Sequence, residues 1–216
     1  KAAIRKTLVA EHDKALATFF DDQRKAVKKA VMSKAAGVFD PTAWNGDLST
    51  ILHTLSKATA QAIGAKVAAD LGGQYSSDDI ASWLESNSAA TAVKINQATA
   101  DEITKALASA GADDTLEDTI DGVFGGEVAA RSNQISLTRV ALVGGLAGLV
   151  AARLSNARTK TWVVTSGKPR PSHAQMSGET VPLGELFSNG MNAPGDYSGG
   201  ADEVAGCTCE MDFSTD

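Results

Sequence analysis

Residues 133–158 read NQISLTRVALVGGLAGLVAARLSNAR and contain the most apolar run of the chain. Leucine, valine and isoleucine recur here at helical spacing, but they are too dense to fit one face of a helix. We therefore expect a central helix that is buried on most of its sides. Its Gly144, Gly145 and Gly148 have the composition of a phosphate-binding loop. No strand precedes them and no Lys-Ser or Lys-Thr pair follows, so close helix packing is the better explanation.

The residues upstream repeat the helical spacing. A serine at position 77, followed by two aspartates, is typical of a helix start. A break is expected near Asn87 and Ser88, because neither residue favours a helix interior. Gly122, Gly125 and Gly126 are expected to weaken a further helix. The helices predicted before residue 133 span residues 3–35 (ended by Gly37), 47–71, 78–110 (with the break) and 114–132.

Composition supports a mainly helical chain. The 216 residues are 43% hydrophobic but only 5% aromatic, which suits closely packed helices better than a sheet. After Arg158 the helical spacing disappears, and residues 162–165 form a short β-like run among Gly, Pro, Ser and Asn. The sequence therefore predicts a mainly α fold with a small C-terminal α+β or irregular module. The expected domains are a helical region, 1–158, and a loop-rich module, 159–216, with Trp162 packing the module onto the last helix.

Charge is distributed unevenly along the chain. The formal net charge is −6, with +5 in residues 1–34 and −11 in the remainder. An acidic body argues against wrapping nucleic acid over a broad surface. The first helix carries cations that are candidates for contact with DNA or an acidic partner, and a solvated helix face is the alternative. These cations are Arg24, Lys25, Lys28 and Lys29.

Cysteine usage and hydropathy exclude two classes of protein. Two cysteines in a chain of this length do not make a secreted disulfide scaffold. Residues 1–5 lack the apolar core of a signal peptide. The longest apolar run, residues 140–152, is 13 residues long, whereas a membrane span needs about 20. We expect a soluble intracellular chain without a membrane span.

Short motifs follow one another through the last 80 residues. Each motif alone is weak, but their order and spacing resemble the signature of the Mu F-like minor head (head morphogenesis) proteins of tailed bacteriophages. Thr208 stands where that family usually has an arginine between two cysteines. The residues that carry the resemblance are Arg139, Lys160, Trp162, Arg170, His173, Gly178, Pro182, Asn189, Gly190, Pro194 (in Pro194-Gly195-Asp196), Glu203, Cys207 and Cys209.

The resemblance implies a structural role in a virion. Proteins of this family are minor capsid components present in few copies, associated with the portal vertex inside the head. They are incorporated during procapsid assembly and are linked to DNA packaging or ejection. The implied partners are the portal protein, capsid or scaffold proteins and genomic DNA, and the implied locations are the host cytoplasm during assembly and then the virion. The resemblance does not imply an enzyme.

Cys207 and Cys209 are the strongest candidates for metal ligands. Residues two apart on an extended segment point to the same side, so with His173 they would supply three ligands for a structural zinc ion. A fourth ligand could come from Asp196, Asp202 or Glu203. The alternatives are a disulfide, or two buried thiols with His173 hydrogen-bonded to a loop.

Two catalytic interpretations compete with the structural one. A thiol-dependent hydrolase or transferase would use Cys207 as the nucleophile and His173 as the base, but no third residue that orients the base is evident. Another set of residues weakly resembles the catalytic parts of ADP-ribosyltransferases, although the Glu-x-Glu element is missing. That set is Arg139, Thr165, Ser166, Arg170 and Glu203.

Overall fold

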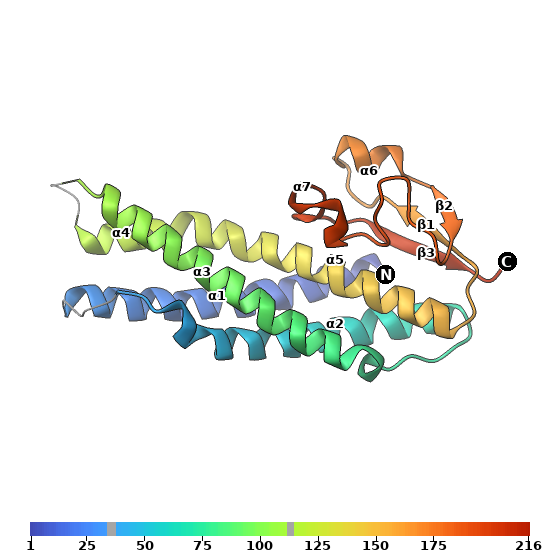
Figure 1. Cartoon of the computed structure of the whole chain (residues 1–216), viewed down its shortest axis with the longest axis horizontal. Helices are drawn as coiled ribbons and strands as arrows, with labels where there is room; N and C mark the ends of the chain where they lie inside the picture. Colours follow the sequence, from blue (N-terminus) through green and yellow to red (C-terminus); the bar gives the residue numbers. More distant parts are fainter. Residues whose placement is uncertain (34–37, 112–114) are drawn as a thin grey trace. The chain divides into compact units, whose positions relative to one another are not determined.

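The computed structural model describes residues 1–33, 38–111 and 115–216, with the side chains of residues 126–129 left aside. The chain is mainly helical and has a small three-stranded antiparallel sheet near its C-terminus, which confirms the predicted fold class (Figure 1). The long helices are α1 (Ala2–Met32), α2 (Asn45–Asp70), α3 (Ala81–Ser109) and α5 (Val128–Leu154). The shorter helices are α4 (Leu116–Gly122), α6 (Pro171–Gln175) and α7 (Ala201–Val204).

The first two helices agree with the expected positions within a few residues. The predicted end of the first helix, at residues 35–37, lies outside the described residues. A 3-10 turn, Pro41–Trp44, precedes α2 and is capped by Asp40, whose carboxylate accepts a hydrogen bond from the Thr42 amide at 2.9 Å. This cap satisfies a backbone donor that the start of a helical segment leaves free.

Two predictions about α3 were wrong. The cap is Ser76 and not Ser77, because the Ser76 hydroxyl accepts from the Asp78 amide while the Asp79 side chain reaches back to the Ser76 amide. The capped 3-10 turn Ser77–Ile80 then leads into α3 without a gap. The helix also continues through Asn87 and Ser88, where a break was expected. Ser88 is buried, so tertiary packing outweighs the low helix propensity of these residues.

The predicted boundary between helices 114–132 and 133–158 was also wrong. The helical backbone passes from α4 through a π-helical turn, Val123–Glu127, directly into α5. The glycines that were expected to weaken the helix lie in and beside this turn, where one extra residue per turn is accommodated without ending the helix. Helix α5 ends at Leu154, followed by Asn156 with φ of 58° and a Schellman-type bond from the Ala157 amide to the Ala152 carbonyl.

Because α4 and α5 form one continuous helical stretch, the expectation that the chain has no membrane span has to be considered again. Among the described residues, the stretch Leu116–Leu154 is long and apolar enough to cross a membrane by length and composition. Its most apolar window is 67% buried within the protein. A core helix of a globular protein is as apolar as a membrane-spanning helix. The burial of this stretch is therefore compatible with the core helix that was expected at residues 133–158.

The chain divides into two compact units. The first unit contains residues 1–11, 55–81 and 134–216, so the C-terminal module belongs with parts of α1, α2 and α5. The predicted division at residue 158 is therefore not the boundary between the units. Within this unit Gly144 lies against the Ile63 side chain and Gly145 against the Pro194 carbonyl. These close approaches agree with the packing role expected of the α5 glycines.

The second unit contains residues 12–54 and 82–133 and is helical. Phe19 packs edge-on against Trp44, with ring centroids 5.7 Å apart. A buried chain of amides runs from Gln23 Nε2 to Asn96 Oδ1 and from Asn96 Nδ2 to Asn45 Oδ1, each at 2.9 Å. These bonds link α1, α3 and the start of α2, and they satisfy polar groups that would otherwise be costly to bury.

The C-terminal sheet has the strand order β2-β1-β3. Its strands are β1 (Thr159–Val163), β2 (Thr180–Pro182) and β3 (Glu210–Ser214), and both pairings are antiparallel. The β-like run predicted at residues 162–165 therefore begins three residues earlier. Trp162 pairs with Met211, and Thr161 pairs with Thr180. In this register alternate residues of β1 point inward, and one of them is Lys160. Because an inward position is usually apolar, the charged Lys160 did not look like part of a strand in the sequence.

Candidate functional site

Strand β1 places a lysine inside the C-terminal module. Lys160 is fully buried, and its Nζ donates to the Asn192 carbonyl at 2.9 Å and to the Asn192 side-chain oxygen. The ammonium group also lies 5.0 Å from the centre of the Phe187 ring. Burial lowers the pKa of Lys160 to about 8, with a further lowering by Arg153 that Asp196 partly offsets. Lys160 thus holds the loop at Asn192 against the sheet.

Trp162 is the centre of the module's core. It is fully buried, in one hydrophobic cluster with Ala141 and Leu149 of α5, as expected for the anchor of the module. Its ring meets His173 edge-on at 5.2 Å and Phe187 at 5.1 Å between centroids. The contact with Trp162 holds the His173 ring against the core of the module.

Helix α6 positions His173. Its first residue is Pro171, which has a backbone angle suited to a helix start, and Arg170 before it donates to the Ala205 carbonyl. The imidazole Nδ1 lies 3.4 Å from the Cys209 sulfur and 3.8 Å from the Cys207 sulfur. The imidazole Nε2 lies 2.9 Å from a carboxylate oxygen of Glu203. His173 therefore bridges two thiols and one carboxylate.

The two cysteines lie on the extended segment that leads into β3. Gly206 precedes them, with its amide bonded to the Thr138 hydroxyl of α5 at 2.9 Å, and both cysteines are free thiols. A hydrogen bond from Cys209 lowers the pKa of Cys207 to about 6, and His173 also contributes. The same bond, together with burial, raises the pKa of Cys209.

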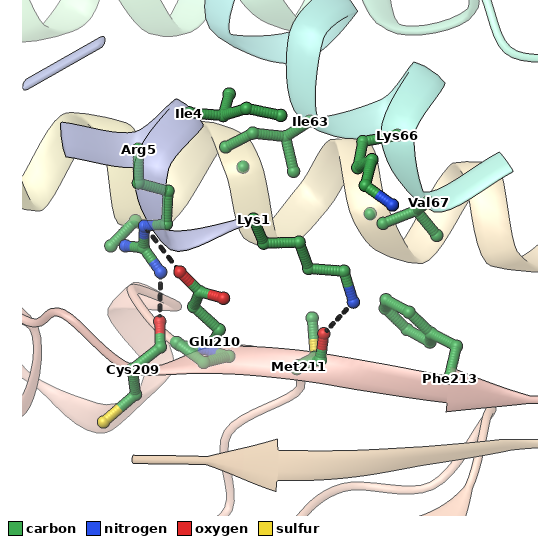
Figure 2. A pocket seen from close by; sticks show the side chains of 15 residues that line it. Lys1, Ile4, Arg5, Ile63, Lys66, Val67, Cys209, Glu210, Met211 and Phe213 are labelled. Carbon is green, nitrogen blue, oxygen red and sulfur yellow. Dashed lines mark hydrogen bonds and ion pairs between the residues drawn. The ribbon is translucent and has the colours of Figure 1, made fainter. Parts of the chain in front are cut away.

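Arg5 is a site residue that sequence reasoning missed. Figure 2 shows its guanidinium beside β3, where it donates to the Cys209 carbonyl and lies 3.8 Å from a Glu210 carboxylate oxygen. Four residues earlier, Lys1 donates to the Met211 carbonyl at 2.9 Å (Figure 2). Because β3 is an edge strand, these side chains cover carbonyls that no strand pairs. No local pattern could connect residues that are about 200 positions apart.

A cavity lies beside these contacts (Figure 2). Its volume is about 30 Å³, and apolar side chains such as Ile4, Ile63 and Phe213 line most of it. That volume holds a water molecule or two and not an organic substrate. The cavity therefore does not identify a substrate site.

The remaining motif residues hold turns or close contacts in the module. Gly178 has φ of 84°, and its amide bonds to the Trp162 carbonyl at 2.9 Å. Gly195, also at φ of 84°, follows Pro194 and presses against the backbone of Leu142 in α5. Three further motif residues form local structure: Pro182 ends β2, Gly190 has a positive φ, and Asn189 accepts from the Met191 amide.

The expected fourth metal ligands are not part of the cluster. Glu203 accepts from Ser172 and places a carboxylate oxygen 2.9 Å from Nε2 of His173, away from the two sulfurs. Asp196 accepts from the Asn192 and Ser198 amides, and Asp202 is exposed. Among the described residues, the metal-ligating group consists of His173, Cys207 and Cys209, whose ligand atoms lie within 4.8 Å of one another.

The residues considered for ADP-ribosyl transfer take part in packing contacts. Arg139 is buried on α5 and donates to the Ser56 hydroxyl at 2.8 Å, and burial lowers its pKa to about 10. Arg170 donates to the Ala205 carbonyl, and Thr165 donates to the Thr208 carbonyl at 2.6 Å. The Arg139 contact joins α5 to α2, and the other two contacts join segments of the module.

The cations considered for DNA contact form ion pairs within the second unit. Lys28 lies 2.6 Å from Glu117 and 2.8 Å from Asp121 of α4. Arg24 also reaches Asp121 at 3.3 Å, and both Arg24 and Lys25 pair with Asp21. Lys29 is exposed. Much of the positive charge that the sequence shows on this helix is therefore balanced locally.

No protein family, curated protein or solved structure matches the chain in comparisons with known proteins.

Proposed function

We propose that this chain is a minor head protein of a tailed bacteriophage, of the Mu F-like class, and that it acts through protein contacts. The observation that carries the proposal is the ordered series of motifs between Arg139 and Cys209, which resembles the signature of that class. In the folded chain the motif residues from Lys160 to Cys209 lie in one module, and Arg139 lies on α5. Lys160 holds a loop, Trp162 fills the core, and Arg170 joins α6 to the segment before the cysteines.

Burial of the reactive groups favours an interaction role over catalysis. Exposed fractions are 2% for His173, 1% for Cys207 and 3% for Cys209. Glu203 does supply the third, orienting residue that a thiol enzyme would need. A nucleophile must nevertheless reach its substrate, and the buried Cys207 cannot do so without opening of the module.

The proposal locates the chain in the virion. It would enter the procapsid in the host cytoplasm and remain inside the head at the portal vertex, in contact with the portal protein and with capsid or scaffold proteins. From there it would support packaging or ejection of genomic DNA. The paired cations of α1 favour protein partners over DNA as its first contact.

Quantitative mass spectrometry of purified particles tests this role. Copies of the chain are counted relative to the portal and major capsid proteins, and abundant host proteins define the contamination background. A few copies per particle, enriched with the portal after disruption, are expected. A count at the host background in both procapsids and mature particles would overturn the proposal.

A further inference from the structure

The geometry around His173 points to a metal ion. Three ligand atoms come from two segments more than 30 residues apart, and each lies on a buried side chain. The Nδ1–Sγ distances are 3.4 Å to Cys209 and 3.8 Å to Cys207. A tetrahedral zinc ion, with Zn–S of about 2.3 Å and Zn–N of about 2.0–2.1 Å, separates such atoms by about 3.6 Å. The two observed distances lie on either side of this value.

The surroundings of the imidazole match those of a metal ligand. When Nδ1 binds a metal, the proton on Nε2 needs an acceptor, and Glu203 offers an oxygen at 2.9 Å. The Ser172 hydroxyl donates to the same carboxylate at 2.9 Å and 3.1 Å, which holds it in place. With a metal ion on Nδ1, a hydrogen bond from Nε2 to this carboxylate would fix the ring and increase the basicity of the ligand nitrogen.

Charge also favours a divalent ion at this position. Two thiolates and one Zn²⁺ form a neutral centre, which can be buried at a lower cost than a single unpaired thiolate. Thiolate and imidazole ligands together select zinc over hard cations such as Mg²⁺ or Ca²⁺.

We propose that His173, Cys207 and Cys209 bind one Zn²⁺. The ion ties α6 to the segment leading into β3, next to Trp162. A small module with a limited core gains stability from such a cross-link. This inference does not depend on the role of the chain in a phage head.

Metal content of the reduced, untagged chain tests the site directly. After equilibration with Zn²⁺ and gel filtration, inductively coupled plasma mass spectrometry is expected to find one zinc per wild-type chain and less than about 0.1 per chain in Cys209→Ser or His173→Gln. Asp202→Asn, on the exposed face of nearby α7, is the matched control and keeps one zinc. Less than about 0.1 zinc in the wild type, or equal zinc in all four proteins, would overturn the proposal.

Two further measurements keep the test independent of folding defects in the variants. Wild type loaded with Co²⁺ is expected to show sulfur-to-metal charge-transfer bands and intense tetrahedral ligand-field bands. Zinc at 100 times its dissociation constant should raise the Tm of the wild type by about 5–10 °C. Co²⁺ spectra without thiolate bands, or an unchanged Tm at saturating zinc, would contradict a site formed by these cysteines.

Discussion

Replacing Gly195 by alanine tests how the module packs on α5. Gly195 has φ of 84°, and a Cβ atom there would lie 2.6 Å from the Leu142 amide nitrogen and 2.8 Å from the Leu142 Cα. The positive φ alone makes a residue with a side chain unfavourable by about 1–2 kcal/mol. The overlap with helix backbone, which cannot move aside as a flexible side chain can, adds about 1–3 kcal/mol. We expect Gly195→Ala to lower the free energy of unfolding by about 3 kcal/mol in total.

Gly178→Ala is the matched control for this experiment. Gly178 has the same φ of 84°, but a Cβ atom there would meet nothing within 4 Å. It should therefore show the backbone effect alone, about 1–2 kcal/mol. Urea unfolding followed by circular dichroism gives both free energies, and thermal scans should place Gly195→Ala several degrees below the control, at about 2–4 °C per kcal/mol. Equal destabilisation of the two variants would refute the close approach of Gly195 to Leu142.

Two further predictions concern buried and paired charges. The pKa of Lys160 is lowered to about 8 in the folded chain from an ordinary 10.5, so between these pH values the unfolded chain binds more protons and folding is favoured as pH rises. The unfolding free energy of wild type minus that of Lys160→Met should therefore increase by up to about 3 kcal/mol from pH 8 to pH 10.5, whereas Lys168→Met, at an exposed position, gives the background. A pH-independent difference would contradict a buried charged lysine. Lys28→Ala should lower the urea midpoint of unfolding in low salt and lower it less in 1 M NaCl, since the pairs of Lys28 with Glu117 and Asp121 are partly exposed and screened by salt. Lys29→Ala, one residue further on the exposed face, should change stability little, and equal effects of the two substitutions would remove the stabilising role assigned to the pairs.

Local pattern predicted the elements whose signals lie in neighbouring residues. The helical spacing of residues 3–35 and 47–71 corresponds to α1 and α2, and the glycines of α5 pack closely as expected. Prediction was wrong where packing outweighed propensity. Ser88 is buried inside an unbroken α3, and Gly125 lies in a π-helical turn that joins two expected helices. Propensities differ by less than about 1 kcal/mol per residue, which burial of the apolar side chains of the same helix, such as Leu84 and Ile95 of α3, readily exceeds.

The candidate site divides in the same way. The spacing of Cys207 and Cys209, and the choice of His173 as their partner, could be read from the sequence because they follow from residue type and strand geometry. The position of Glu203 could not be read from the sequence, because a glutamate beside the imidazole and a glutamate that binds the metal look the same in the sequence. Arg5 gave no signal at all, since its contact with the Cys209 carbonyl joins the two ends of the chain.

The sequence by itself determined that this chain is mainly helical, that a small module follows Arg158, and which residues of that module are chemically distinctive. These properties depend on periodicity and composition, which are local. Only the tertiary structure decided that Lys160 is buried, that Lys28 of α1 is paired, and that His173 lies between two sulfurs and a carboxylate. These properties depend on which segments, distant in the sequence, pack against each other. Such contacts determine which side chains are buried and which charges have a partner.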